Sequence, residues 1–256
     1  MTTRTQEQNA AALAGHDGFS LISNEKLRQL YIAMVKCDEL EQRARILSPQ
    51  SELDGNDGVR LEAAVVGVMI DLVPEDTVSV PDGDFIASFL KGESLDKLLR
   101  SLRSSAASPK FAVQLENVIG AAQTCKSQKN GQVAVAFLSD GAASSSLWHK
   151  ALKRAGAEQL PILFVCLNSS ETGEIALQAE ADGFPGITVD GCDVVAVYRV
   201  ATEAIAHARK GNGPTVLECN FERPAVSDPI LSMESYLARK SLFSEELKLE
   251  AASCFI

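Results

Sequence analysis

The chain has 256 residues, and its 24 lysines and arginines against 34 aspartates and glutamates give a formal net charge of −10. A negative charge of this size repels nucleic-acid phosphates and anionic lipids, which argues against nucleic acid or a membrane as the main partner. The length predicts a single large domain, which we place at residues 21–256, after a flexible N-terminal leader at residues 1–20.

The composition also bears on the cellular compartment. Six cysteines are scattered singly along the chain and none forms a C-x-x-C pair. This distribution is typical of reduced, buried thiols in a cytosolic protein. The N-terminal residues lack a basic start followed by an apolar run, and no window approaches the roughly 18 apolar residues of a membrane span. We therefore expect a cytoplasmic protein.

The first predicted element is an amphipathic helix. Ser23 is a candidate N-cap, and apolar residues recur over residues 27–47 at spacings of three and four. We expect this helix to end near Pro49, because proline cannot continue the hydrogen-bond pattern.

The second predicted helix is apolar on every face. Residues 61–72 read LEAAVVGVMIDL, a composition typical of a helix that is buried on all sides. Its small residues Ala63, Ala64 and Gly67 would let another helix approach closely. That neighbour belongs either to another subunit or to the core of the same chain.

From residue 76 onward, strand and helix signals alternate. The runs VAVAFL at 133–138 and PILFVCL at 161–167 are continuously apolar, which is typical of parallel strands covered on both faces. The other predicted elements are strands at 76–80 and 215–221, and helices that begin near residue 94 and span 111–126, 145–157, 194–210 and 233–252. A polar link is expected from residue 169 to residues 188–191. The alternation predicts an α/β fold, a parallel sheet flanked by helices on both faces.

Polar residues follow two neighbouring predicted strands, at the strand ends where open α/β sheets place their sites. Asp140 lies between one strand and the next helix, and Asn168 ends the following strand. A carboxylate and an amide oxygen are suited to hold Mg²⁺, and a helix N-terminus is suited to hold a diphosphate. The same spacing also fits an aspartate that only caps the helix.

The motifs of several other enzyme classes are absent. The sequence holds no G-x-x-x-x-G-K-[ST] and no G-x-G-x-x-G between a strand and a helix, which excludes the usual nucleotide-binding loops. It also lacks G-x-S-x-G, and its three histidines are far apart, which argues against a hydrolase triad.

Six segments of the chain follow one known family in order and nearly in register. They are LISNEKLRQLYIAMVKCDELEQRA, LVPEDTVSVP, LKGESLDKLL, VAVAFLSDGAASSSLWHKAL, LPILFVCLN and VDGCDVVAVYRVATEAIAHARKGNGPTVLE. Over residues 21–252 the chain thus resembles the alpha subunit of thiamine-diphosphate-dependent 2-oxo acid dehydrogenases of the pyruvate, branched-chain and acetoin type.

The resemblance implies a fold, a cofactor and a partner. The fold is the parallel α/β domain that binds thiamine diphosphate, and the cofactor lies between the alpha subunit and a beta-type subunit in a hetero- or homo-oligomer. The alpha subunit supplies the diphosphate and Mg²⁺ side, whereas the beta subunit supplies the glutamate that activates the aminopyrimidine. The chemistry is decarboxylation of a 2-oxo acid and acyl transfer to lipoyl.

The resemblance also assigns site residues, position by position. The expected cofactor-binding residues are Gly120, Ser139, Gly141, Ala142, Ser144 and Asn168. The expected metal ligands are Asp140, Asn168 and Ser169.

Several of these positions depart from the family pattern. Ser139 replaces the first glycine of the family's Gly-Asp-Gly, and Ser169 stands where the second of two asparagines is the metal ligand. Phe85 stands in the position of the family's histidine, so no catalytic residue is assigned, because phenyl neither donates nor accepts a proton. Arg60 and Leu61 replace Gly-Gln at the start of the buried helix, and two cofactor loops are missing.

Two functions remain open on the sequence. The chain is either an alpha-type subunit that still binds the cofactor and has impaired activity, or a non-catalytic structural or regulatory relative that keeps the fold and the subunit interface.

Overall fold

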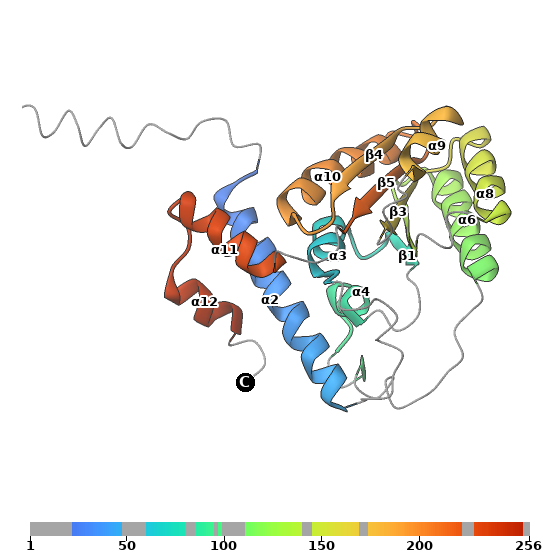
Figure 1. Cartoon of the computed structure of the whole chain (residues 1–256). Helices are drawn as coiled ribbons and strands as arrows, with labels where there is room; N and C mark the ends of the chain where they lie inside the picture. The colour runs from blue at the N-terminus through green and yellow to red at the C-terminus, as the bar shows by residue number, and fades with distance from the viewer. Residues whose placement is uncertain are drawn as a thin grey trace, which may run out of the picture.

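Five strands form one sheet in the computed structural model of the chain (Figure 1). The structure describes residues 22–47, 60–79, 85–94, 97–98, 111–139, 145–168, 174–221 and 228–252. The strands are β1 (Thr77–Ser79), β2 (Ala134–Ser139), β3 (Ile162–Asn168), β4 (Gly186–Asp190) and β5 (Thr215–Asn220), and they lie in the order β1-β2-β3-β5-β4. Every neighbouring pair is parallel, which confirms the predicted sheet.

Alternate side chains of the central strands face two separate cores. In β2, Val135 and Phe137 pack into one core, and Ala136 and Leu138 pack into the other. Successive side chains of a strand point to opposite faces, so a strand buried on both faces must be apolar at every position. This requirement explains the unbroken apolar runs in the sequence.

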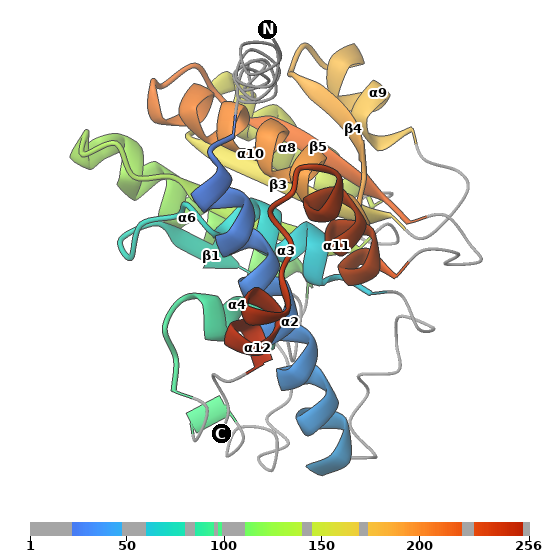
Figure 2. The ribbon, with the colours of Figure 1, turned by 90° about the vertical axis from the view of Figure 1, so that its left-hand side faces the viewer.

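Helices cover both faces of the sheet, as predicted. On one face lie α6 (Phe111–Gln128), α8 (Ser146–Ala157) and α9 (Ile175–Ala181), which contribute to the same core. The other face is covered by α3 (Glu62–Met69), α4 (Phe85–Leu90) and α10 (Val194–Arg209), with α2 (Asn24–Leu47), α11 (Pro229–Arg239) and α12 (Glu245–Ala252) packed outside them (Figures 1 and 2).

The first helix, α2, begins where the sequence predicts. The Ser23 hydroxyl accepts a hydrogen bond from the backbone N–H of Lys26 at 3.1 Å, which is the expected N-cap contact. One side of α2 packs against α11 and α12, and these two elements close the outer layer of the molecule (Figure 2). Within the described ranges, no helix combines the length and apolar character that crossing a membrane requires.

The apolar helix α3 is a core helix of this chain. All eight of its residues are buried, and it packs against α10, α2 and α4. A Cβ atom added at Gly67 would lie 2.8 Å from Cγ1 of Val197 on α10. The small residues of α3 therefore allow α10 to approach closely. The neighbour that packs on this side of α3 belongs to the same chain.

Several predicted elements differ from those of the structure. Residues 233–252 do not form one helix, because the chain breaks between α11 and α12 at Ser241, whose φ is 58°. The start of α11 also lies earlier than predicted, at Pro229, with Asp228 as its N-cap. The link expected between Asn168 and residues 188–191 contains α9 and β4, and α4 was not predicted either.

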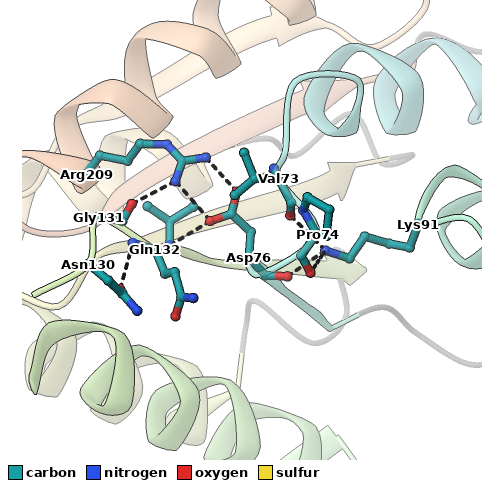
Figure 3. A network of polar contacts seen from close by, with 9 residues as sticks. Val73, Pro74, Asp76, Lys91, Asn130, Gly131, Gln132 and Arg209 are labelled. Atoms are coloured by element: carbon teal, nitrogen blue, oxygen red, sulfur yellow. Dashed lines mark hydrogen bonds and ion pairs between the residues drawn. The ribbon is translucent and has the colours of Figure 1, made fainter. Parts of the chain in front are cut away.

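Asp76 ties together the elements at the amino end of the strands (Figure 3). Its carboxylate accepts hydrogen bonds from the Arg209 guanidinium at 2.5 and 3.0 Å and from the backbone N–H groups of Val73 and Val133 at 2.9 and 3.0 Å. Lys91 donates to the Asp76 carbonyl at 2.6 Å. Because Val133 leads into β2 and Arg209 ends α10, one carboxylate joins three segments.

Candidate functional site at the carboxyl edge of the sheet

Each of the five strands ends in a polar residue. The last residues of β1 to β5 are Ser79, Ser139, Asn168, Asp190 and Asn220. Because the sheet is parallel, these residues lie at one edge, and Asn168 and Asp190 are both paired in register with Asn220. Ser139 lies one residue lower, opposite Leu167, and is exposed. The carboxyl edge is therefore the polar edge of the sheet.

The chain changes sides of the sheet between β3 and β5. After β3 it enters α9, on the face that also carries α6 and α8. After β5 the next described helix is α11, on the opposite face. In open α/β sheets such a switch point opens a crevice outside the carboxyl ends of the strands, and ligands bind there.

Asn168 lies at this switch point and is held by two side chains of β5. Its amide nitrogen donates hydrogen bonds to Oε1 of Glu218 at 2.8 Å and to Oδ1 of Asn220 at 3.1 Å. Only 1% of the surface of Asn168 is exposed. Since the amide nitrogen faces these two acceptors on β5, the amide oxygen lies on the side away from Glu218.

Glu218 is a site residue that was not predicted from the sequence. It is 1% exposed, and its second oxygen accepts a hydrogen bond from the Ala176 backbone N–H in the first turn of α9, at 2.9 Å. The available signal was a charged residue inside the apolar strand TVLECNF, because glutamate is almost never fully buried without a partner.

The structure describes only some of the predicted site residues. Ser139 and Asn168 both end strands at the carboxyl edge. Gly120 lies in the middle of α6, exposed and with nothing within 4 Å of a Cβ built on it, nine residues after the helix begins. The remaining predicted binding residues, which lie outside the described residues, are Asp140, Gly141, Ala142, Ser144 and Ser169. Phe85 is the first residue of α4.

The structure removes one alternative for Asp140. The N-cap of α8 is Ser145, whose hydroxyl accepts a hydrogen bond from the Trp148 backbone N–H at 3.2 Å. Asp140 is therefore not the cap of this helix. The role of Asp140 as a metal ligand stays a prediction.

The predicted metal ligands carry the type of ligand atom that suits a magnesium ion. Asp140, Asn168 and Ser169 would offer oxygen atoms only, which is the ligand type that Mg²⁺ prefers. The one described member, Asn168, has its amide orientation fixed by β5. Among the described residues, no group of three or more histidine, cysteine, aspartate or glutamate side chains could hold a metal.

A second polar cluster surrounds Arg60, just before α3. The guanidinium contacts Asp38 of α2, Glu62 of α3 and Asp228, the N-cap of α11, each at 2.7 Å. Burial raises the pKa of Glu62, and the positive charge of Arg60 only partly opposes this shift. Arg60, which stands at the first position of Gly-Gln in the resemblance, thus joins three helices.

A small cavity lies beside this cluster, between the first turn of α10 and α11. Its volume is about 170 Å³, and its lining includes Asp190, Cys192 and Tyr236. Burial, with smaller contributions from the charges of Asp190 and Glu62, raises the pKa of the Cys192 thiol to about 11. A thiol with so high a pKa is a weak nucleophile at neutral pH.

Comparison with known proteins places the sequence in a family. The family model of the dehydrogenase E1 component matches residues 100–225. The chain is 30% identical over 244 residues to the alpha subunit of acetoin:2,6-dichlorophenolindophenol oxidoreductase from Bacillus subtilis, an alignment that covers 81% of this chain and 72% of that subunit. It is 34% identical over 170 residues to the alpha subunit of 3-methyl-2-oxobutanoate dehydrogenase from Mycobacterium tuberculosis, covering 54% of this chain and 46% of that one.

A third relative matches over a shorter stretch. The alpha-3 subunit of the chloroplastic pyruvate dehydrogenase E1 component from Arabidopsis thaliana is 34% identical over 148 residues, which cover 45% of this chain and 35% of that subunit. The chain thus spans about three quarters of one relative and less than half of the other two. Taken with the parallel sheet, these matches show that the chain belongs to the family of alpha subunits of thiamine-diphosphate-dependent 2-oxo acid dehydrogenases, the dehydrogenase E1 component.

Proposed function

We propose that this chain is an alpha-type subunit that binds thiamine diphosphate and Mg²⁺ at the carboxyl edge of its sheet. The observation that carries the proposal is the Asn168 carboxamide, buried at the switch point and held by Glu218 and Asn220. An amide that is already oriented loses little conformational freedom when it ligates a metal. In this proposal Asp140, Asn168 and Ser169 hold the ion.

The remaining cofactor contacts come from the turn after β2. Ser139, Gly141, Ala142 and Ser144 would border the diphosphate, because this turn leads into the N-terminus of α8. When bound, the cofactor would supply a nucleophilic carbon and an electron sink for the decarboxylation of a 2-oxo acid. The chain itself contributes the binding and orientation of the diphosphate end.

The proposed partner is a beta-type subunit. The relatives are named as alpha subunits, and the family resemblance assigns the glutamate at the aminopyrimidine end to the beta subunit. A complete site therefore needs a second polypeptide, in an oligomer that contains both.

We further propose that turnover is impaired. Phe85, at the start of α4, stands where the family has a histidine, and phenyl cannot exchange a proton with the substrate. The alternative is a non-catalytic relative, which the Arg60 cluster favours. Three ion pairs join α2, α3 and α11 at that cluster, so Arg60, one of the two residues that replace the family's Gly-Gln, serves the packing of helices.

Calorimetric titration separates the two functions. The full chain, alone and with its beta-type subunit, is titrated with thiamine diphosphate and Mg²⁺. We expect a Kd in the micromolar range, which corresponds to a binding free energy of about −8 kcal/mol. Binding should be lost in Asp140→Ala. It should be kept in Glu116→Ala, which changes an exposed acidic residue on α6. Absence of binding with the partner present would leave only the non-catalytic function.

A narrower experiment concerns the missing histidine. Phe85→His is assayed for decarboxylation of 2-oxo acids beside the unchanged chain, both with the beta-type subunit. A rise in turnover by about 100-fold or more, the usual scale of a positioned acid–base group, would show that the remaining site works. Equal rates in a variant that still binds the cofactor would show that Phe85 is not what limits turnover.

A further inference from the structure

Glu218 is an unusual residue for the interior of a parallel sheet. It lies in β5 opposite Cys166 of β3, is 1% exposed, and no lysine or arginine contacts it within the part of the chain that the structure describes. Burial of a carboxylate without a cation costs free energy unless hydrogen bonds replace the lost water. Glu218 meets this condition, because each of its oxygens accepts a hydrogen bond from another element.

The two oxygens of Glu218 serve two different elements. Oε1 accepts from the Asn168 amide at 2.8 Å, and Oε2 accepts from the Ala176 backbone N–H at 2.9 Å. Asn168 is the last residue of β3, and Ala176 lies in the first turn of α9. One carboxylate thus contacts the last residue of β3 and the second residue of α9, the two elements on either side of the connection.

The contact also selects the orientation of the amide. The nitrogen and oxygen of a carboxamide have similar size, but only the oxygen can bind a cation. A site that uses the oxygen therefore needs a neighbouring acceptor that binds the nitrogen and so fixes the orientation of the amide. Both oxygens of Glu218 act as acceptors here, so the nitrogen of Asn168 must face β5. Asn220 supports the same orientation by accepting from the same nitrogen at 3.1 Å.

We propose that Glu218 is a positioning residue for the cofactor site: by accepting hydrogen bonds from the Asn168 amide and the first turn of α9, it presents the Asn168 oxygen to the metal ion. This inference rests on the proposed function. It adds a residue from β5, a strand that carries none of the expected cofactor or metal ligands.

Glu218→Gln tests the contact with almost no change in shape. Glutamine has only one acceptor oxygen, so either the Asn168 amide or the Ala176 N–H would face its NH₂ group. We expect the affinity for Mg²⁺ with thiamine diphosphate, measured by calorimetry with the beta-type subunit, to fall by about 10- to 100-fold, the usual effect of losing a hydrogen-bond partner behind a metal ligand.

The double variant N168D/E218Q provides the rescue. The glutamine introduced at position 218 can accept from Ala176 N–H with its oxygen and donate to the carboxylate introduced at position 168. Asn220 accepts from the Asn168 amide in the unchanged chain, and in the double variant it can turn its own amide so that its nitrogen donates to the new carboxylate. Asn168→Asp alone places two carboxylates in contact. We expect both single variants to lower the melting temperature and the affinity, and the double variant to recover most of both.

Two outcomes separate this inference from the function on which it rests. If the unchanged chain binds cofactor but Glu218→Gln binds it equally well, Glu218 is not a positioning residue and the proposed function stands. If the unchanged chain binds no cofactor while the double variant recovers the melting temperature, the pairing of Glu218 with Asn168 is correct and the proposed function is wrong. Additive losses of melting temperature in the double variant would overturn the pairing itself.

Discussion

At each end of the sheet, one buried carboxylate accepts hydrogen bonds from several elements. At the amino end Asp76, whose side chain is fully buried, accepts two hydrogen bonds from Arg209 and two from backbone N–H groups. At the carboxyl end Glu218 accepts from Asn168 and from α9. Both carboxylates satisfy donors that the strands and helices leave unpaired, so each residue acts on several elements at once.

We expect Asp76→Ala to destabilise the fold strongly. The change removes the ion-pair partner of Arg209 and leaves two backbone N–H groups without an acceptor, so the free energy of unfolding should fall by about 3 kcal/mol or more. Urea denaturation of the purified chain measures this value. Glu93→Ala is the matched control, because its exposed i,i+4 pair with Lys97 should contribute less than about 0.5 kcal/mol.

Glu62 gives the stability of the protein an unusual dependence on pH. Burial raises the pKa of this carboxyl above its ordinary value of 4.5. A group whose pKa is raised in the folded state stabilises the fold below its unfolded pKa, and that contribution is lost as pH rises through the folded pKa. Asp71 has the opposite sign, because hydrogen bonds from Lys26 and Tyr198 outweigh its burial and lower its pKa.

The pH dependence can be isolated by substitution. In Glu62→Gln the carboxyl no longer titrates, so we expect the free energy of unfolding of this variant, relative to the unchanged chain, to increase as pH rises above about 4.5. For Asp71→Asn we expect the free energy of unfolding, relative to the unchanged chain, to decrease as pH rises, and over a lower pH range. Denaturation curves at a series of pH values give both, and a difference for Glu62→Gln that does not vary with pH would contradict the assignment.

At the scale of elements, the packing of α3 against α10 decides which small residues matter. Gly67 lies where a Cβ atom would be 2.8 Å from Val197 Cγ1 and 3.1 Å from the backbone nitrogen of Tyr198. Gly120 has the same helical context in α6 but faces open space. The two glycines therefore respond to alanine in opposite ways.

We expect Gly67→Ala to lower the free energy of unfolding by about 1 kcal/mol, since overpacking against α10 exceeds the gain in helix propensity. Gly120→Ala should raise it by about 0.5–1 kcal/mol, because only the gain in propensity applies. Thermal or urea denaturation measures both changes. A stabilising Gly67→Ala would mean that α10 lies farther from α3.

For the molecule as a whole, cofactor binding and folding must be linked if the proposed function is correct. A ligand that binds only the folded chain at about 100 times its Kd adds about 2.7 kcal/mol to the free energy of unfolding. We therefore expect the melting temperature to rise when thiamine diphosphate and Mg²⁺ are added together to the chain and its beta-type subunit. The rise should vanish in Asp140→Ala, and neither component alone should reproduce it.

Much of the fold follows from sequence patterns that act locally. The sequence predicts β2, β3, α2 and α10 within a few residues. A strand buried on both faces is apolar at every position, and a helix buried on one side is apolar at a spacing of three and four, so both can be recognised from residue types. Short, half-buried elements leave a weaker record. This is why β4, an edge strand, and the six-residue helix α4 were missed.

The candidate site divides in the same way. The sequence alone determined the α/β class, the parallel sheet, the family resemblance and the position of Asn168 at a strand end. Only the tertiary structure decided that β5, rather than β4, lies beside β3, which brings Glu218 to the Asn168 amide. The two residues are 50 positions apart, and their contact depends on strand order and register, which are set by the packing of both cores and not by any local pattern.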